Sequence, residues 1–208
     1  MGGIKLRIHP LFYLFGVYYA ITGRIFVFLI YTVCALSHEL GHSLVAERAG
    51  YKLNKITLMP FGAVVTGYVA GLKPADRLKI ALAGPMVNLC VALLFVSLWW
   101  VFPTVYAYTD TVVVANLCMC VINLIPAYPL DGGRMLYAFL SERFSEKRAG
   151  KICRATGISL ALVLLVLFTF SAFNTVNFSL LFFALFVLVG AFNTDKENRY
   201  VKIRSVLL

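Results

Sequence analysis

Long apolar runs separated by short polar loops dominate the chain. Read as helices, they cover six segments, at about residues 10–22, 25–48, 78–102, 111–139, 155–173 and 177–193. Most of these runs have the roughly 20 residues that a helix needs to cross the hydrocarbon core of a bilayer. The pattern predicts an all-α polytopic membrane protein, with six transmembrane helices forming one domain over residues 1–193.

Composition supports a membrane protein. Hydrophobic residues make up 61% of the chain and charged residues 13%, against about 45–50% and 25% in soluble domains. The formal net charge is +10, but the basic residues do not form the clustered patch that binds nucleic acid. No nucleic-acid partner is expected.

The positions of the basic residues predict the topology. With six spans, 18 of the 19 lysines and arginines fall on one side and only Arg24 falls on the other. Cytoplasmic loops carry such an excess, so both termini are expected to be cytoplasmic. Residues 194–208 then form a short basic cytoplasmic tail; either the natural chain ends there or a following regulatory domain is missing.

Residues 58–71, LMPFGAVVTGYVAG, contain no charge but are too short to cross a bilayer as a helix. The proline, glycines and β-branched residues favour extended backbone. Non-helical backbone at membrane depth must pair internally or line a cavity. This segment is predicted to be a re-entrant, β-hairpin-like element after the second span; the alternative is a surface loop that dips into the headgroups.

Two histidines and a glutamate occur inside the second predicted span, in the sequence HELGH at residues 38–42. On a helix, His38 and His42 share one face and can bind one metal ion, while Glu39 can reach a water on that metal. This is the pattern of zinc hydrolases, with Glu39 as the general base. Buried ionisable groups are costly in lipid, and a bound cation would stabilise them.

A third ligand is expected from NLIPAYPLDGGR, residues 123–134, where two prolines break the fourth span. Asp131 is the candidate, and the alternative is a kinked helix whose Asp131 pairs with Arg134. Asn123 lies eight residues earlier on the same side of the break. It could donate to a substrate carbonyl or a developing oxyanion, or form an interhelical hydrogen bond.

The third span begins with AGPMVN, residues 83–88. Its small residues predict close helix packing, with Asn88 as a polar tie rather than a catalytic group.

Together, HELGH, the PFG of the hairpin segment, AGPMVN and NLIPAYPLDGG resemble the site-2 protease family of intramembrane zinc metalloproteases. The resemblance covers essentially the whole chain. It implies one zinc ion (Zn2+) per chain on His38, His42 and Asp131, with Glu39 as the base. It also implies substrate contact by Asn123 and by the hairpin near Phe61 and Gly62.

The expected activity is hydrolysis of a membrane-tethered protein in the cytoplasmic half of the bilayer. The order and spacing of the motifs are most similar to the sporulation branch of the family. That branch implies a bacterial inner-membrane enzyme, in the outer forespore membrane during sporulation. It also implies a sigma-factor precursor as substrate and membrane proteins as inhibitors.

Other functions remain open at this point. The substrate could instead be an anti-sigma factor or a signal-peptide remnant. A different class of function, a metal transporter or metal-binding membrane protein, could use the same three ligands. Transporters often contain inverted repeats with paired broken helices, and the sequence shows no internal repeat.

Overall fold

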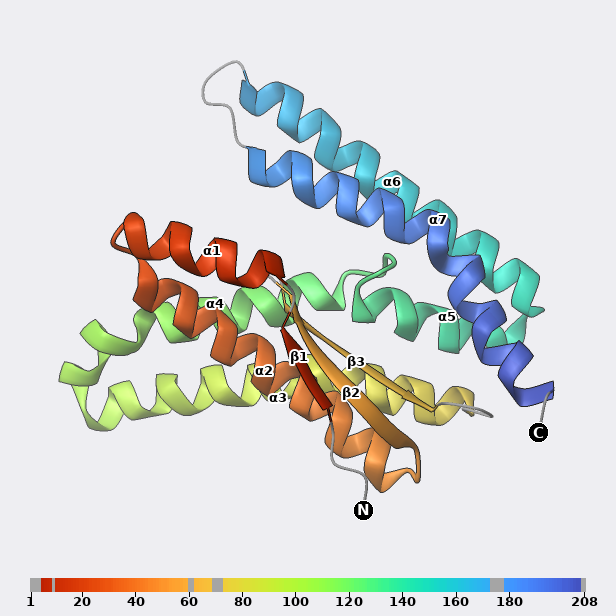
Figure 1. Ribbon diagram of the computed structural model, residues 1–208, viewed down its shortest axis with the longest axis horizontal. Helices are drawn as coiled ribbons and strands as arrows, with labels where there is room; N and C mark the ends of the chain where they lie inside the picture. Colours follow the sequence, from red (N-terminus) through yellow and green to blue (C-terminus); the bar gives the residue numbers. More distant parts are fainter. Residues whose placement is uncertain (1–4, 9, 60–61, 69–72, 173–177, 207–208) are drawn as a thin grey trace. The chain divides into compact units, whose positions relative to one another are not determined.

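The computed structural model describes the backbone of residues 5–8, 10–59, 62–68, 73–172 and 178–206, with side chains described within 12–51, 73–171 and 178–193 (Figure 1). The chain folds as two compact units. The first comprises Met1–Val69 and Leu82–Ile122, and the second comprises Ala70–Ala81 and Asn123–Leu208.

The helices of the first unit follow the predicted apolar runs closely. They are α1 (Pro10–Ile21), α2 (Ile25–Arg48), the part of α3 (Pro74–Val101) from Leu82 onward, the short 3-10 helix η1 (Pro103–Val105) and most of α4 (Tyr106–Leu124). The turn between α1 and α2 contains Gly23 at φ 71°, a conformation that glycine adopts readily. The ring of Phe28 on α2 lies 5.0 Å from Phe12 and 5.6 Å from Tyr19, centre to centre, which fixes the two helices together.

A three-stranded sheet completes the first unit, in a fold that is otherwise helical as predicted. Its strands are β1 (Lys5–Ile8), β2 (Lys52–Met59) and β3 (Gly62–Tyr68), in the order β1-β2-β3. β2 pairs in parallel with β1 and antiparallel with β3. Both β2 and β3 contact α2. The hairpin therefore starts six residues before the predicted 58–71 segment, and its position in a membrane stays a prediction.

The physical reason is a β-bulge that hides the strand pattern. Leu53 and Lys55 pair with neighbouring residues of β3, so Asn54 is the extra residue of the bulge. With Asn54 set aside, polar and apolar residues alternate along β2, as in a strand with two different faces. β1 follows the same alternation, and the register pairs Leu6 with Ile56. Lys52 and Lys55 place the first part of β2 outside the uncharged segment at residues 58–71.

The predicted break of the fourth span is confirmed in the second unit. Helix α4 ends at Leu124, and α5 (Asp131–Arg143) begins only after a non-helical stretch that contains Pro126 and Pro129. Helices α6 (Glu146–Ala172) and α7 (Phe178–Val206) follow and run side by side (Figure 1). The backbone of the predicted tail continues α7 as helix through Val206.

Small residues let the break pack against α6 and α7. A Cβ atom on Gly190 would lie 2.7 Å from the backbone nitrogen of Pro129, and one on Gly157 would lie 2.8 Å from the Cβ of Ala191. Ala161 and Ala191 are fully buried. Close approach of this kind is typical of helices that associate in lipid, where dispersion contacts replace hydrophobic burial.

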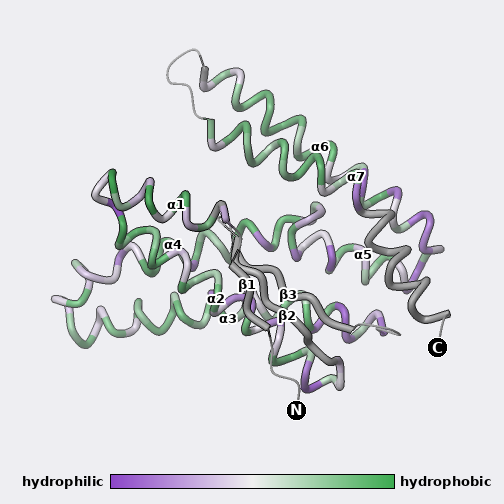
Figure 2. Tube along the Cα trace, viewed as in Figure 1, coloured by the Kyte–Doolittle hydropathy of each residue, from purple (hydrophilic) through white to green (hydrophobic). Residues whose placement is uncertain are grey.

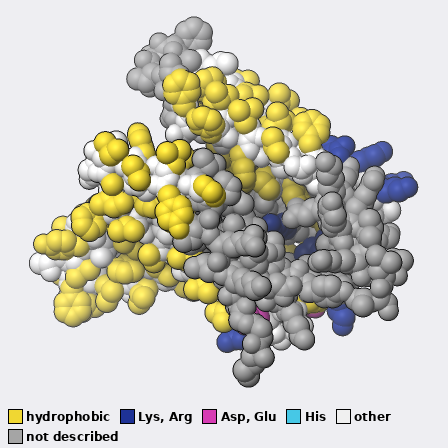
Figure 3. Space-filling view, viewed as in Figure 1, with side chains coloured by type: hydrophobic (Ala, Val, Ile, Leu, Met, Phe, Trp, Pro, Cys, Tyr) yellow, Lys and Arg dark blue, Asp and Glu magenta, His cyan; other side chains and the backbone are white. Residues whose placement is uncertain are grey.

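Four helices of the described part are long and apolar enough to cross a membrane: Ile25–Arg48, Pro74–Val101, Pro103–Leu124 and Glu146–Ser171. Two shorter apolar helices, Phe12–Ile21 and Phe178–Asn193, accompany them. The middle parts of these helices are predominantly hydrophobic (Figure 2), and hydrophobic side chains cover much of the described surface seen in Figure 3. The protein is therefore a multi-pass membrane protein, while the number of six spans remains a prediction.

The close approach at Gly190 can be tested. Gly190→Ala should destabilise the protein by about 1–3 kcal/mol, because the added methyl meets the backbone of Pro129 rather than a flexible side chain. Gly16→Ala is the matched control, since its Cβ would lie at an ordinary 3.5 Å from Phe28. Unfolding temperatures in detergent micelles, followed by intrinsic fluorescence, measure the difference. Equal temperatures for the two variants would contradict the packing argument.

Candidate metal centre

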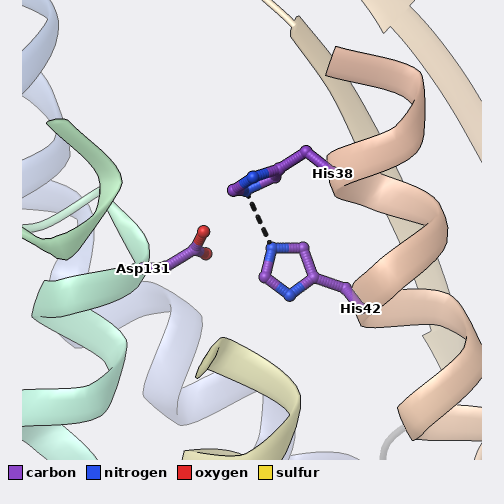
Figure 4. A group of neighbouring side chains, drawn as sticks. All are labelled: His38, His42 and Asp131. Carbon is purple, nitrogen blue, oxygen red and sulfur yellow. Dashed lines mark hydrogen bonds between the residues drawn. The ribbon is translucent and has the colours of Figure 1, made fainter. Parts of the chain in front are cut away.

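Two histidines project from the same face of α2. His38 and His42 are both buried, and their Nε2 atoms lie 3.1 Å apart (Figure 4). Two nitrogen ligands of one tetrahedral zinc ion, each at about 2.0–2.1 Å, are separated by about 3.3 Å. The pair therefore has the spacing of two ligands to a single ion.

Gly84 on α3 keeps the space beside these nitrogens clear. A Cβ atom at this position would contact His42 Nε2 and lie 2.7 Å from His38 Nε2. Gly41 on α2 has the matching role, because a Cβ there would lie 2.9 Å from the carbonyl oxygen of Ala83. The predicted close packing of residues 83–88 is confirmed, and it leaves both imidazoles room for an ion.

Asn88 on α3 holds the ring of His38. Its Oδ1 lies 2.5 Å from His38 Nδ1, and its Nδ2 donates to Asn116 Oδ1 on α4 at 2.7 Å. The sequence predicted a polar tie at Asn88, but not that the tie would reach a histidine of the candidate metal centre. The sequence did not predict a role for Asn116, because a single asparagine in an apolar helix does not indicate which residue it bonds to.

Asp131 is the first residue of α5 and is buried. The positive end of a helix dipole favours a carboxylate there. Cβ atoms on Gly132 and Gly133 would collide with the backbone of residues 124–128, so these glycines let the break fold back onto α5. The predicted alternative partner is also present, because Arg134 Nη1 lies 3.3 Å from Asp131 Oδ1. That separation is long for a charge-assisted hydrogen bond, so Asp131 keeps acceptor capacity for an ion.

The ligand atoms of His38, His42 and Asp131 all lie within 4.8 Å of one another (Figure 4). Two imidazole nitrogens and one carboxylate oxygen form a typical donor set for catalytic zinc, which leaves a fourth position open. This group is able to bind a metal ion, and its chemistry fits zinc.

The roles predicted for the other site residues remain predictions, and their positions are as follows. Glu39 follows His38 on α2 and is half-buried, and Asn123 is half-buried in the last turn of α4. Gly62 is the first residue of β3, whereas Phe61 lies outside the described residues. The five cysteines form no disulfide, and Cys118 is exposed while Cys120 is buried, because residues two apart point to different faces of a helix.

Several known proteins are similar to this chain in sequence. Peptidase family M50 matches residues 25–114 and 101–164. A zinc metalloprotease of Methanocaldococcus jannaschii is 34% identical over 98% of this chain and 60% of its own length. Stage IV sporulation protein FB of Bacillus subtilis is 25% identical over 98% of this chain and 70% of its own length.

A solved structure is similar as well. The site-2 protease from Methanocaldococcus jannaschii matches with a TM-score of 0.71 and 32% identity, over 93% of this chain and 92% of that chain. This chain spans less than two thirds of the length of the first of these relatives. The match to the family covers more than half of the present chain and includes both histidines and Asp131. The chain therefore belongs to peptidase family M50, the site-2 protease family of membrane zinc metalloproteases.

Proposed function

We propose that this protein is an intramembrane zinc metalloprotease that cleaves a membrane-tethered protein. His38, His42 and Asp131 hold one zinc ion, and Glu39 is the general base. One observation carries the proposal: a buried group of three metal-ligating side chains, two of them on a helix apolar enough to span a membrane. Membership of a peptidase family favours hydrolysis over metal transport.

Zinc, when bound, lowers the pKa of a coordinated water towards 7 and polarises a carbonyl group. Glu39 is rotated about 100° from His38 around the helix, so it lies beside the metal rather than on it. Its carboxylate accepts a proton from the attacking water and then donates that proton to the leaving nitrogen. Asn123 donates a hydrogen bond to the substrate carbonyl as negative charge develops on its oxygen.

The depth of the reaction follows from the position of His38 on α2. Arg48 ends this helix, and His38 lies ten residues before it, which corresponds to about 15 Å. With six spans and both termini in the cytoplasm, cleavage falls in the cytoplasmic half of the bilayer. The positive-inside distribution of lysine and arginine supports this topology.

A substrate helix must unwind before its peptide bonds can be attacked, and the freed backbone groups need new partners. β3 can supply them. Among the described strands, β2 is paired on both sides, whereas β3 lies at the edge of the sheet and contacts α2. The substrate therefore adds as a strand along β3 and contacts Gly62, the first residue of that strand, and Phe61 before it.

Similarity to stage IV sporulation protein FB favours a sporulation role. The proposed substrate is then a membrane-tethered sigma-factor precursor, the location is the bacterial inner membrane or outer forespore membrane, and membrane proteins act as inhibitors. An anti-sigma factor or a signal-peptide remnant is the alternative substrate, and the same chemistry serves all three.

The role of Glu39 is tested by Glu39→Gln. This variant should bind zinc at the wild-type stoichiometry but lose proteolysis by at least about 100-fold, because the amide cannot accept the proton. Glu47→Gln is the matched control, since Glu47 is exposed on the same helix. Zinc is measured by atomic absorption, and cleavage by mass spectrometry after co-expression with single-span tethered reporters. Wild-type turnover in Glu39→Gln would refute the general-base assignment.

The role of β3 is tested with two neighbouring substitutions, Val64→Pro and Val65→Pro. Adjacent residues of an edge strand alternate their N–H groups between the partner strand and the free edge. One proline should therefore disturb the hairpin, while the other removes only an edge donor that a substrate would use. The proline that removes only an N–H group at the free edge should abolish cleavage and leave the zinc content and the unfolding temperature unchanged. Full activity in both variants would exclude strand addition at this position.

A further inference from the structure

Two fully buried asparagines join three helices around His38. Asn88 on α3 and Asn116 on α4 are 0% and 1% exposed. Asn88 bonds to His38 on α2, and Asn116 bonds to Asn88 and to the thiol of Cys34, at 3.1 Å from its Sγ. A buried amide is destabilising unless its donors and acceptor are paired, so the direction of each hydrogen bond in this chain matters.

A backbone carbonyl fixes that direction. Asn116 Nδ2 lies 2.8 Å from the carbonyl oxygen of Val112, one turn earlier on α4. A carbonyl oxygen can only accept, so the NH2 group of Asn116 must face Val112 and its Oδ1 must face Asn88. That Oδ1 in turn requires a donor, which is the Nδ2 of Asn88 at 2.7 Å.

The same reasoning continues to the histidine. With its NH2 group directed at Asn116, and 3.5 Å from the carbonyl oxygen of Cys34, Asn88 turns its Oδ1 towards His38. This oxygen can only accept, so His38 carries its proton on Nδ1. The lone pair of His38 is then on Nε2, the atom that faces His42.

We propose that Asn116 is a positioning residue that sets the tautomer of His38 through Asn88, and thereby the affinity of the centre for zinc. Without Asn116, the NH2 group of Asn88 loses its close acceptor at 2.7 Å and keeps only the Cys34 carbonyl at 3.5 Å, so the amide can rotate its NH2 group towards Nδ1. His38 would then carry its proton on Nε2 and have no lone pair for the metal. The inference rests on the proposed function only in taking His38 as a zinc ligand.

A second hydrogen bond between α3 and α4, distant from His38, provides a control for the loss of Asn116. Trp99 Nε1 donates to Thr109 Oγ1 at 2.8 Å, which also joins these two helices but lies away from His38 along them. Thr109→Val removes one α3–α4 hydrogen bond without touching the chain of amides, whereas Asn116→Leu removes one such bond together with the contact to the Cys34 thiol on α2.

The experiment measures zinc affinity of the full-length protein in micelles by competition with a chelator. Asn116→Leu should weaken zinc binding roughly ten-fold, the low end of the 10–100-fold range for groups that orient metal ligands. Thr109→Val should leave the affinity unchanged. In an Asn88→Asp background, Asn116→Leu should cause no further loss of zinc affinity, because both oxygens of a carboxylate accept and the side chain has no NH2 group for Asn116 to orient.

A second measurement needs no variant that might fail to fold. NMR of the zinc-loaded wild-type protein labelled with 15N-histidine should show His38 protonated at Nδ1 and metal-bound at Nε2; the chain has three histidines to assign. The opposite tautomer would overturn the proposal. So would equal zinc affinities of Asn116→Leu and Thr109→Val, or an undiminished Asn116→Leu effect in the Asn88→Asp background. Wild-type protein that bound no zinc would instead refute the proposed function.

Discussion

The structure depends on one constraint: ionisable side chains lie inside apolar helices, where each charge costs at least a few kcal/mol. His38 and His42 are buried on a helix with the composition of a membrane span, and Asp131 is buried at the start of α5. Two neutral imidazoles and one carboxylate leave a net negative charge that a divalent cation offsets. The glycines around them follow from the same constraint, because an ion needs space that a Cβ at Gly84 would fill.

The break between α4 and α5 makes the carboxylate usable. In an intact helix, the backbone N–H of residue 131 would be bonded within the helix and the positive end of a dipole would lie elsewhere. Ending α4 at Leu124 and restarting at Asp131 places the carboxylate at a helix N-terminus. Gly132, Gly133 and Gly190 then allow the non-helical backbone to pack closely against neighbouring backbone, which satisfies the rule that such backbone must be enclosed by protein in lipid.

Features that depend on local sequence were predictable, and features that depend on distant partners were not. Histidines four residues apart share a helix face whatever surrounds them, and Pro126 with Pro129 must interrupt a helix. The first part of β2 was not predicted because the bulge at Asn54 shifts its alternation, and β1 was not predicted because so short a strand forms only when paired with β2. The role of Asn116 was not predicted because it depends on hydrogen bonds to the Val112 carbonyl and to Asn88.

The use of asparagines near His38 is itself explained by the membrane. In soluble zinc proteins, the outer nitrogen of a metal-bound histidine often donates to a carboxylate, which fixes the tautomer without further help. A second carboxylate beside His38 would add another buried charge to a centre that already contains Asp131. A neutral amide avoids that charge but can present either end to the histidine. It therefore needs a fixed reference, and the helix carbonyl of Val112, which can neither rotate nor donate, provides one through Asn116.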